Sequence, residues 1–213
     1  MNIKRIAMYA NSPTIELLPS IPIGHIIWND FEQYKNDIIQ SCLEDEKTNQ
    51  IDSGIATSIK NNLWESGFNF LESKPKLKPL SDWLHFTTND FVNTICQKTH
   101  KLRILESWAH VSRPGGFHGP HRHGEYTYSG IFYVDADDID SGPTVFFNPF
   151  TMPSGDGYEW YNEQFLVNFI PGKLIIFPST LLHYAKPYLG KDKRIVIAFN
   201  SYVYNEQLIS RYK

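Results

Sequence analysis

Two neighbouring histidines and one distant histidine are the side chains in this sequence best suited to chemistry. His121 and His123 form a His-x-His pair, Glu125 follows two residues later, and His183 comes after a strongly apolar run. Residues i and i+2 of an extended strand face the same side, so His121 with His123, or His123 with Glu125, could face one metal ion. His183 is the best candidate for a third ligand.

Arg194 is the second residue in an unusual position. It opens the segment 194–200, RIVIAFN, which we interpret as a strand with two alternating faces. If Ile195 and Ile197 pack against an outer layer, Arg194 faces the interior. A buried guanidinium is costly unless it meets a carboxylate or phosphate, and its geometry suits a two-pronged salt bridge to a dicarboxylate. The other interpretation is a structural ion pair at a strand end.

The segments that must position these residues are predominantly β-strands. Short apolar stretches separated by Pro-Gly and Ser-Gly-Pro turns predict a sandwich, a barrel or a jelly roll. The stretch 148–161 carries prolines, glycines and aromatic residues, so we expect a loop that could cover a substrate. We expect strands at residues 102–111, 127–134, 144–148, 165–170, 173–177 and 194–203.

The first hundred residues predict an edge strand and two helices. Residues 21–27 form an apolar run with Pro22, which cannot donate a hydrogen bond to a strand ladder. Apolar residues at helical spacing predict one helix over about 30–44 and a second, capped by Ser81, that ends near residue 97. The lysine-rich stretch 74–78 is expected to be a solvated linker.

The composition is that of a globular protein. The chain has 213 residues, 41% of them hydrophobic, and a formal net charge of −3. This charge gives no basic excess for nucleic-acid binding. Two cysteines make no disulfide framework and no apolar run could span a membrane, so we expect a cytoplasmic protein. We expect a single domain over 1–213, with an N-terminal strand and supporting helices in 1–100 and a catalytic core in 101–205. No pattern predicts its oligomeric state.

Several pieces of the sequence, taken in order, resemble the Fe(II)- and 2-oxoglutarate-dependent oxygenases. More narrowly, they resemble a group of these oxygenases from marine bacteria and phages that is related to prolyl hydroxylases. The resemblance covers about residues 102–203 and implies a double-stranded β-helix, a jelly-roll or cupin-like barrel with flanking helices. It is carried by Trp108, His121-Arg-His123, 129–134 (SGIFYV), 172–178 (GKLIIFP), His183 and 194–200 (RIVIAFN).

The resemblance implies an iron site with one of two ligand sets. Aligning the strand that follows the histidine pair gives His121, His123 and His183, which we prefer. The other register gives His123, Glu125 and His183, which restores the His-x-carboxylate pattern common in the superfamily. The preferred set has no anionic ligand, which is unusual for this chemistry.

The resemblance also implies a site for the co-substrate 2-oxoglutarate. Arg194 would bind its far carboxylate, and Tyr133 would contact the same group. Val196 differs from many relatives, which carry a small hydroxyl residue two positions after the arginine.

The implied reaction uses O2 to hydroxylate a substrate, with release of succinate and CO2. The substrate is not identified by the sequence and could be a small molecule or a peptide. Two other interpretations stay open: a zinc-dependent hydrolase or lyase on a three-histidine site, or a cupin-like metal-binding module or structural protein without catalysis. Arg194 has no evident task in a zinc site.

Overall fold

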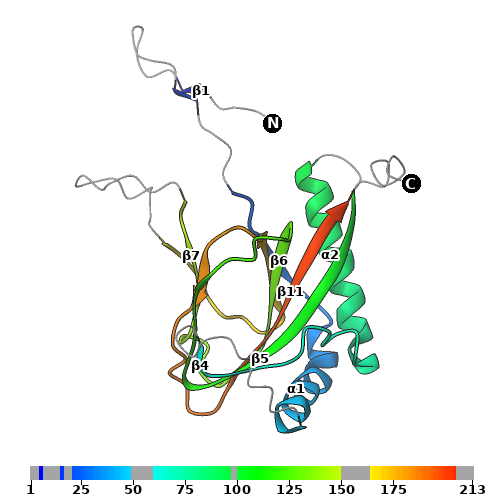
Figure 1. Cartoon of the computed structure of the whole chain (residues 1–213), viewed down its shortest axis with the longest axis vertical. Helices are drawn as coiled ribbons and strands as arrows, with labels where there is room; N and C mark the ends of the chain where they lie inside the picture. The colour runs from blue at the N-terminus through cyan, green and yellow to red at the C-terminus, as the bar shows by residue number, and fades with distance from the viewer. Residues whose placement is uncertain are drawn as a thin grey trace, which may run out of the picture.

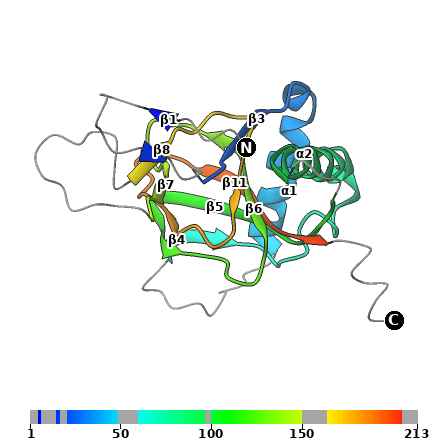
Figure 2. The same ribbon diagram turned by 90° about the horizontal axis from the view of Figure 1, so that it is seen from above.

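The structure is a computed structural model that describes residues 5–6, 15–16, 21–48, 60–96, 100–149 and 164–204. Helices α1 (Phe31–Thr48) and α2 (Lys78–Cys96) lie together on one side of a β barrel (Figures 1 and 2). Strands β1 (Arg5–Ile6) and β2 (Ile15–Glu16) form a separate short pair. The barrel strands are β3 (Gly24–Ile27), β4 (Lys60–Glu65), β5 (Lys101–His121), β6 (Tyr128–Ala136), β7 (Thr144–Phe147), β8 (Gln164–Val167), β9 (Lys173–Pro178), β10 (His183–Ala185) and β11 (Arg194–Tyr204).

The barrel strands form one curved antiparallel sheet, with β3 and β8 at its two ends. Their order is β3-β9-β6-β11-β5-β10-β7-β8, and β4 pairs with β5. β5 belongs to both halves of the barrel, because its first part pairs with β11 through Arg194↔Ser112 and its end pairs with β10 through His183↔His121. This arrangement is a double-stranded β-helix of the jelly-roll type, and the predicted fold class is confirmed.

β11 shows how sequence alternation builds the two faces of the sheet. Ile195, Ile197 and Phe199 join the core beneath the helices, whereas Val196 joins a second core inside the barrel. Each such fully buried side chain contributes about 1.5–3 kcal/mol. Gly130 on β6 leaves room for the Phe199 ring, because a Cβ at that position would collide with it. The predicted alternation of β11 is confirmed.

The helix boundaries differ from the predicted ones. α1 continues to Thr48, beyond the expected end near residue 44. A short 3-10 helix, η1 (Pro75–Leu77), leads directly into α2, which begins at Lys78 rather than after Ser81. The prediction of a solvated linker over 74–78 was wrong, because this stretch is helical and Leu77 is buried. Pro79 lies in the first turn of α2, where a proline is tolerated.

The strands were predicted unevenly. β3 confirms the expected edge strand, because it lies at the end of the sheet and pairs with β9. β5 runs well beyond the predicted end at residue 111, and β4 and β10 were not predicted. Beyond residue 149, the loop expected over 148–161 lies outside the described residues. Neither α1 nor α2 has an apolar stretch that would let it cross a membrane.

Candidate metal and co-substrate site

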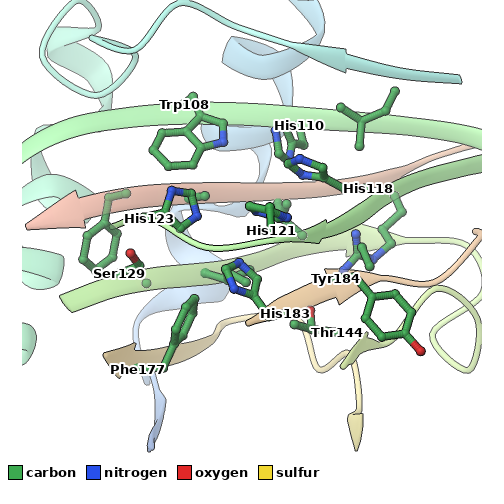
Figure 3. A pocket seen from close by; sticks show the side chains of 18 residues that line it. Trp108, His110, His118, His121, His123, Ser129, Thr144, Phe177, His183 and Tyr184 are labelled. Atoms are coloured by element: carbon green, nitrogen blue, oxygen red, sulfur yellow. The ribbon is translucent and has the colours of Figure 1, made fainter. Parts of the chain in front are cut away.

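The three histidines of the preferred ligand set converge in the interior of the barrel. His121 ends β5, His183 opens β10, and the pairing of these strands sets the two residues opposite each other. His123 follows β5, and its backbone N–H donates to the Ser179 carbonyl at 2.8 Å. One ring nitrogen from each histidine lies within 4.8 Å of the others (Figure 3). Such spacing suits a single metal ion.

Hydrogen bonds fix the protonated nitrogen of two of these rings, those of His121 and His183. Nδ1 of His121 lies 2.8 Å from the Gly119 carbonyl oxygen, and Nδ1 of His183 lies 2.9 Å from that of Leu181. A carbonyl oxygen can only accept, so Nδ1 carries the proton in both rings. Nε2 of each neutral ring therefore keeps its lone pair, the state that a metal ligand requires.

His123 is held by a different network. Its Nδ1 lies 3.4 Å from Nδ2 of Asn200, which also donates to Glu106 at 3.2 Å. The Ser129 hydroxyl donates to the other side of the Asn200 amide at 2.8 Å. An amide nitrogen donates, so Nδ1 of His123 accepts in this arrangement. Metal binding through Nε2 would place the proton on Nδ1, and the Asn200 amide would then have to turn its oxygen toward His123.

Glu125, the carboxylate of the alternative ligand set, lies away from this cluster. Its side chain is exposed. The group of potential metal ligands found among the described residues contains His121, His123 and His183, without Glu125.

Burial keeps two of the rings neutral. Burial, with a smaller contribution from the nearby His121, lowers the pKa of His123 to about 4 and that of His183 to about 3. A ring with so low a pKa is unprotonated at neutral pH. Protons therefore compete only weakly with a metal ion for these nitrogens.

Arg194 lines the same cavity from β11. Its side chain is only 4% exposed, and its Nε has no hydrogen-bond partner among the described residues. The guanidinium carbon lies 5.8 Å from the Tyr133 ring centroid and 5.4 Å from that of Phe169. Burial lowers the Arg194 pKa, but an arginine stays charged at neutral pH. A buried cation without a carboxylate partner in the described chain favours an anionic ligand.

A second buried cation, Lys173, is less suited to binding an anionic ligand in the cavity. Its ammonium group donates to the Asn168 carbonyl oxygen and lies 5.4 Å from the Tyr133 ring centroid. Among the described residues, those that line the cavity include Arg194 but not Lys173.

Tyr133 lies behind the cavity wall. It is fully buried, and its hydroxyl donates to Oγ1 of Thr144 at 2.8 Å. Burial raises the pKa of Tyr133 to about 12, so it remains a donor. Thr144 does line the cavity, and because its oxygen accepts from Tyr133, its own O–H is left to donate to a ligand. No sequence pattern points to Thr144, because β7 is too short to show a clear period.

Further polar residues extend the cavity wall. The His118 ring stacks on His121 with centroids 3.9 Å apart, and the His110 ring lies 5.4 Å from His118. Nε2 of His110 lies 2.6 Å from a carboxylate oxygen of Glu65, and both side chains are buried. Neither His110 nor His118 was predicted as a site residue. Alternation along β5 places His110 on the same face as Trp108, so this residue could have been predicted to face the interior. Its partner Glu65 could not, because β4 was not predicted.

One family model matches part of the chain. Residues 106–200 match the family model described as "Putative 2OG-Fe(II) oxygenase". No curated protein matches the chain significantly.

Solved structures of low sequence identity share the fold. A Pseudomonas putida prolyl-4-hydroxylase is similar with a TM-score of 0.56 and 14% identity, over 85% of this chain and 93% of that chain. The epimerase SnoN, solved with Fe3+, alpha ketoglutarate and nogalamycin RO, gives a TM-score of 0.65 and 8% identity, over 85% and 79%. A Trichoplax adhaerens prolyl hydroxylase, solved with a hypoxia inducible factor peptide fragment, gives 0.56 and 12%, over 89% and 87%.

The family match spans the part of the barrel that carries the candidate site. Residues 106–200 include the three converging histidines, Tyr133 and Arg194. The fold, the match and the three-histidine cluster agree with the expected cofactors, Fe(II) and 2-oxoglutarate. The family match and the shared fold indicate an Fe(II)- and 2-oxoglutarate-dependent oxygenase.

Proposed function

We propose that His121, His123 and His183 bind Fe(II) and that Arg194 binds the far carboxylate of 2-oxoglutarate. One observation carries this proposal: the buried Arg194 guanidinium, which has no carboxylate partner among the described residues, lines the same cavity as three converging imidazoles. A zinc hydrolase would need the imidazoles but would leave the buried Arg194 without a task. A metal-binding module without catalysis would also not need it.

Each side chain has a defined part in this proposal. When bound, iron and 2-oxoglutarate supply the oxidising chemistry, and the protein supplies geometry and a dry pocket. Arg194 offers a two-pronged salt bridge, and the Thr144 hydroxyl can donate to the same carboxylate. Tyr133 orients that hydroxyl. Thr144 would thus supply the hydroxyl that many relatives carry at the position of Val196.

The proposed ligand set contains no carboxylate, but two carboxylates connect to it through intermediate side chains. Glu106 accepts from Asn200, which contacts His123. Glu65 pairs with His110, whose ring lies close to that of His118. Negative charge is thus available near the site without a direct bond to the metal, and such outer partners tune bound metals.

We propose that the enzyme hydroxylates a small molecule or a peptide, with O2 as co-reactant. The family supports an oxidative reaction with a substrate. The structural neighbours support both substrate sizes, because one was solved with a peptide fragment and another with nogalamycin RO. A screen of both classes, followed by mass spectrometry for addition of one oxygen, tests this part.

Matched alanine variants test the ligand set. Purified protein is loaded anaerobically with Fe(II), and the bound iron is measured for His121→Ala and Glu125→Ala. We expect His121→Ala to lose bound iron and Glu125→Ala to keep one iron per chain. Loss of iron only in Glu125→Ala would overturn the proposed set in favour of His123, Glu125 and His183.

A further inference from the structure

Trp108 is a residue of the cavity wall with a polar atom that the site described so far does not use. The side chain is 4% exposed, and its indole Nε1 has no hydrogen-bond acceptor among the described residues. Folded proteins rarely leave a buried N–H without a partner, and such atoms often mark a place for a ligand. Trp108 also lines the cavity that contains the three histidines.

The indole ring is held firmly in this position. Phe68 packs edge-on against it at 5.5 Å between ring centroids, and the His123 ring lies 5.7 Å away. The His110 ring lies 6.3 Å away, and in Figure 3 the indole nitrogen is on the side of Trp108 that faces His110. A donor packed among three rings has few positions open to it, which favours one acceptor position.

Trp108 and Arg194 lie at different levels along the strands of the barrel. Trp108 is opposite Ala198 and Arg194 is opposite Ser112 in the β11–β5 pairing. Four residues of strand separate the two levels, roughly 13 Å along the backbone. Both side chains are long and enter one cavity, so they can approach opposite ends of an extended dicarboxylate.

We propose that the Trp108 indole N–H donates to an oxygen at the keto-acid end of 2-oxoglutarate, the end that chelates the metal. This inference rests on the proposed function, in which Arg194 holds the far carboxylate. Trp108 is close to the His123 ring, whereas Arg194 contacts Tyr133 and Phe169 instead. The acceptor is then an anionic oxygen, which makes a stronger hydrogen bond than a neutral one.

Two keto acids separate the roles of the two donors. Anaerobic calorimetry of Fe(II)-loaded protein gives the affinity for 2-oxoglutarate and for pyruvate, which has the keto-acid end without the far carboxylate. We expect Trp108→Phe to weaken both by about tenfold or more. Arg194→Ala should weaken 2-oxoglutarate alone. Trp83→Phe is the matched control, because Trp83 stacks on Trp28 in the outer core and should change neither affinity.

The outcomes distinguish this inference from the proposed function. If iron-loaded wild-type protein does not bind 2-oxoglutarate, the proposed function fails. If the wild type binds it and folded Trp108→Phe binds both keto acids equally well, the role of Trp108 is overturned. A donor used only by the substrate would give this second result.

A measurement on the wild type keeps the test valid if Trp108→Phe does not fold. With diamagnetic Zn(II) in the site, the Trp108 indole proton is observed by NMR and assigned from its proximity to the His123 ring. We expect this resonance to move downfield when 2-oxoglutarate is added. A resonance that stays in place while 2-oxoglutarate binds would contradict the inference.

Discussion

The two faces of the sheet around β11 are built from the same strands but have opposite chemistry. On the outer face, Ile195, Ile197 and Phe199 pack beneath the helices among apolar side chains. On the inner face, Arg194 and, on the neighbouring β5, Trp108 bury polar atoms that have no partner among the described residues. The outer face therefore stabilises the fold, whereas the inner face gives up stability that a bound ligand can restore.

A cavity in the outer face should affect stability but not binding. Ile197 is fully buried, so Ile197→Ala should lower the free energy of unfolding by about 2–5 kcal/mol. Urea denaturation measures this loss. The affinity of the folded fraction for 2-oxoglutarate should stay at the wild-type value, and a large change in it would show that the two faces are not independent.

Removing the charge from the inner face should have the opposite effect. We expect Arg194→Met to weaken 2-oxoglutarate binding about 100-fold, since a buried charge pair is then lost. The unfolding free energy of the ligand-free protein should not fall, because an apolar side chain replaces a buried cation that has no carboxylate partner in the part of the chain that the structure describes. Calorimetry and denaturation of the same variant test both parts. A marked loss of stability would identify Arg194 as a structural residue.

Acid should act on the inner face as well. The pKa values of His123 and His183 are lowered in the folded state, to about 4 and about 3, because burial disfavours their charged forms. Their contribution to stability is therefore complete above the unfolded pKa near 6.5 and is lost as the pH falls toward the folded values. We expect the metal-free protein to lose about 1–2 kcal/mol per histidine by pH 5. Denaturation across this range should show a shallower pH dependence for His183→Leu.

The smallest expected effect concerns Thr144. Thr144→Val removes the hydroxyl and keeps the shape, so 2-oxoglutarate affinity should fall about three- to tenfold. The affinity for pyruvate should not change, because the hydroxyl is proposed to act on the far carboxylate. An equal loss of affinity for both acids would show that the Thr144 hydroxyl acts on the keto-acid end instead.

The outer and inner faces also differ in how well the sequence predicted them. Alternation in 194–200 predicted both faces of β11, because a long, regular strand shows its period. The spacing of His121 and His123 predicted that the two side chains could share one metal ion, and the structure brings both close to His183. The three-residue β10 and the strand β4 were missed because short or isolated segments show no period. The contacts of His123 with Asn200 and of Tyr133 with Thr144 join different strands, so no local pattern could predict them.

The most direct test of the central claim is an anaerobic absorption measurement on iron-loaded protein. Adding 2-oxoglutarate to the Fe(II) protein should produce the weak visible charge-transfer band of the chelated keto acid. The band should be absent in His183→Ala and present in Glu125→Ala. Folded, iron-loaded wild-type protein that gives no band would contradict the assignment of these histidines and Arg194 to iron and 2-oxoglutarate.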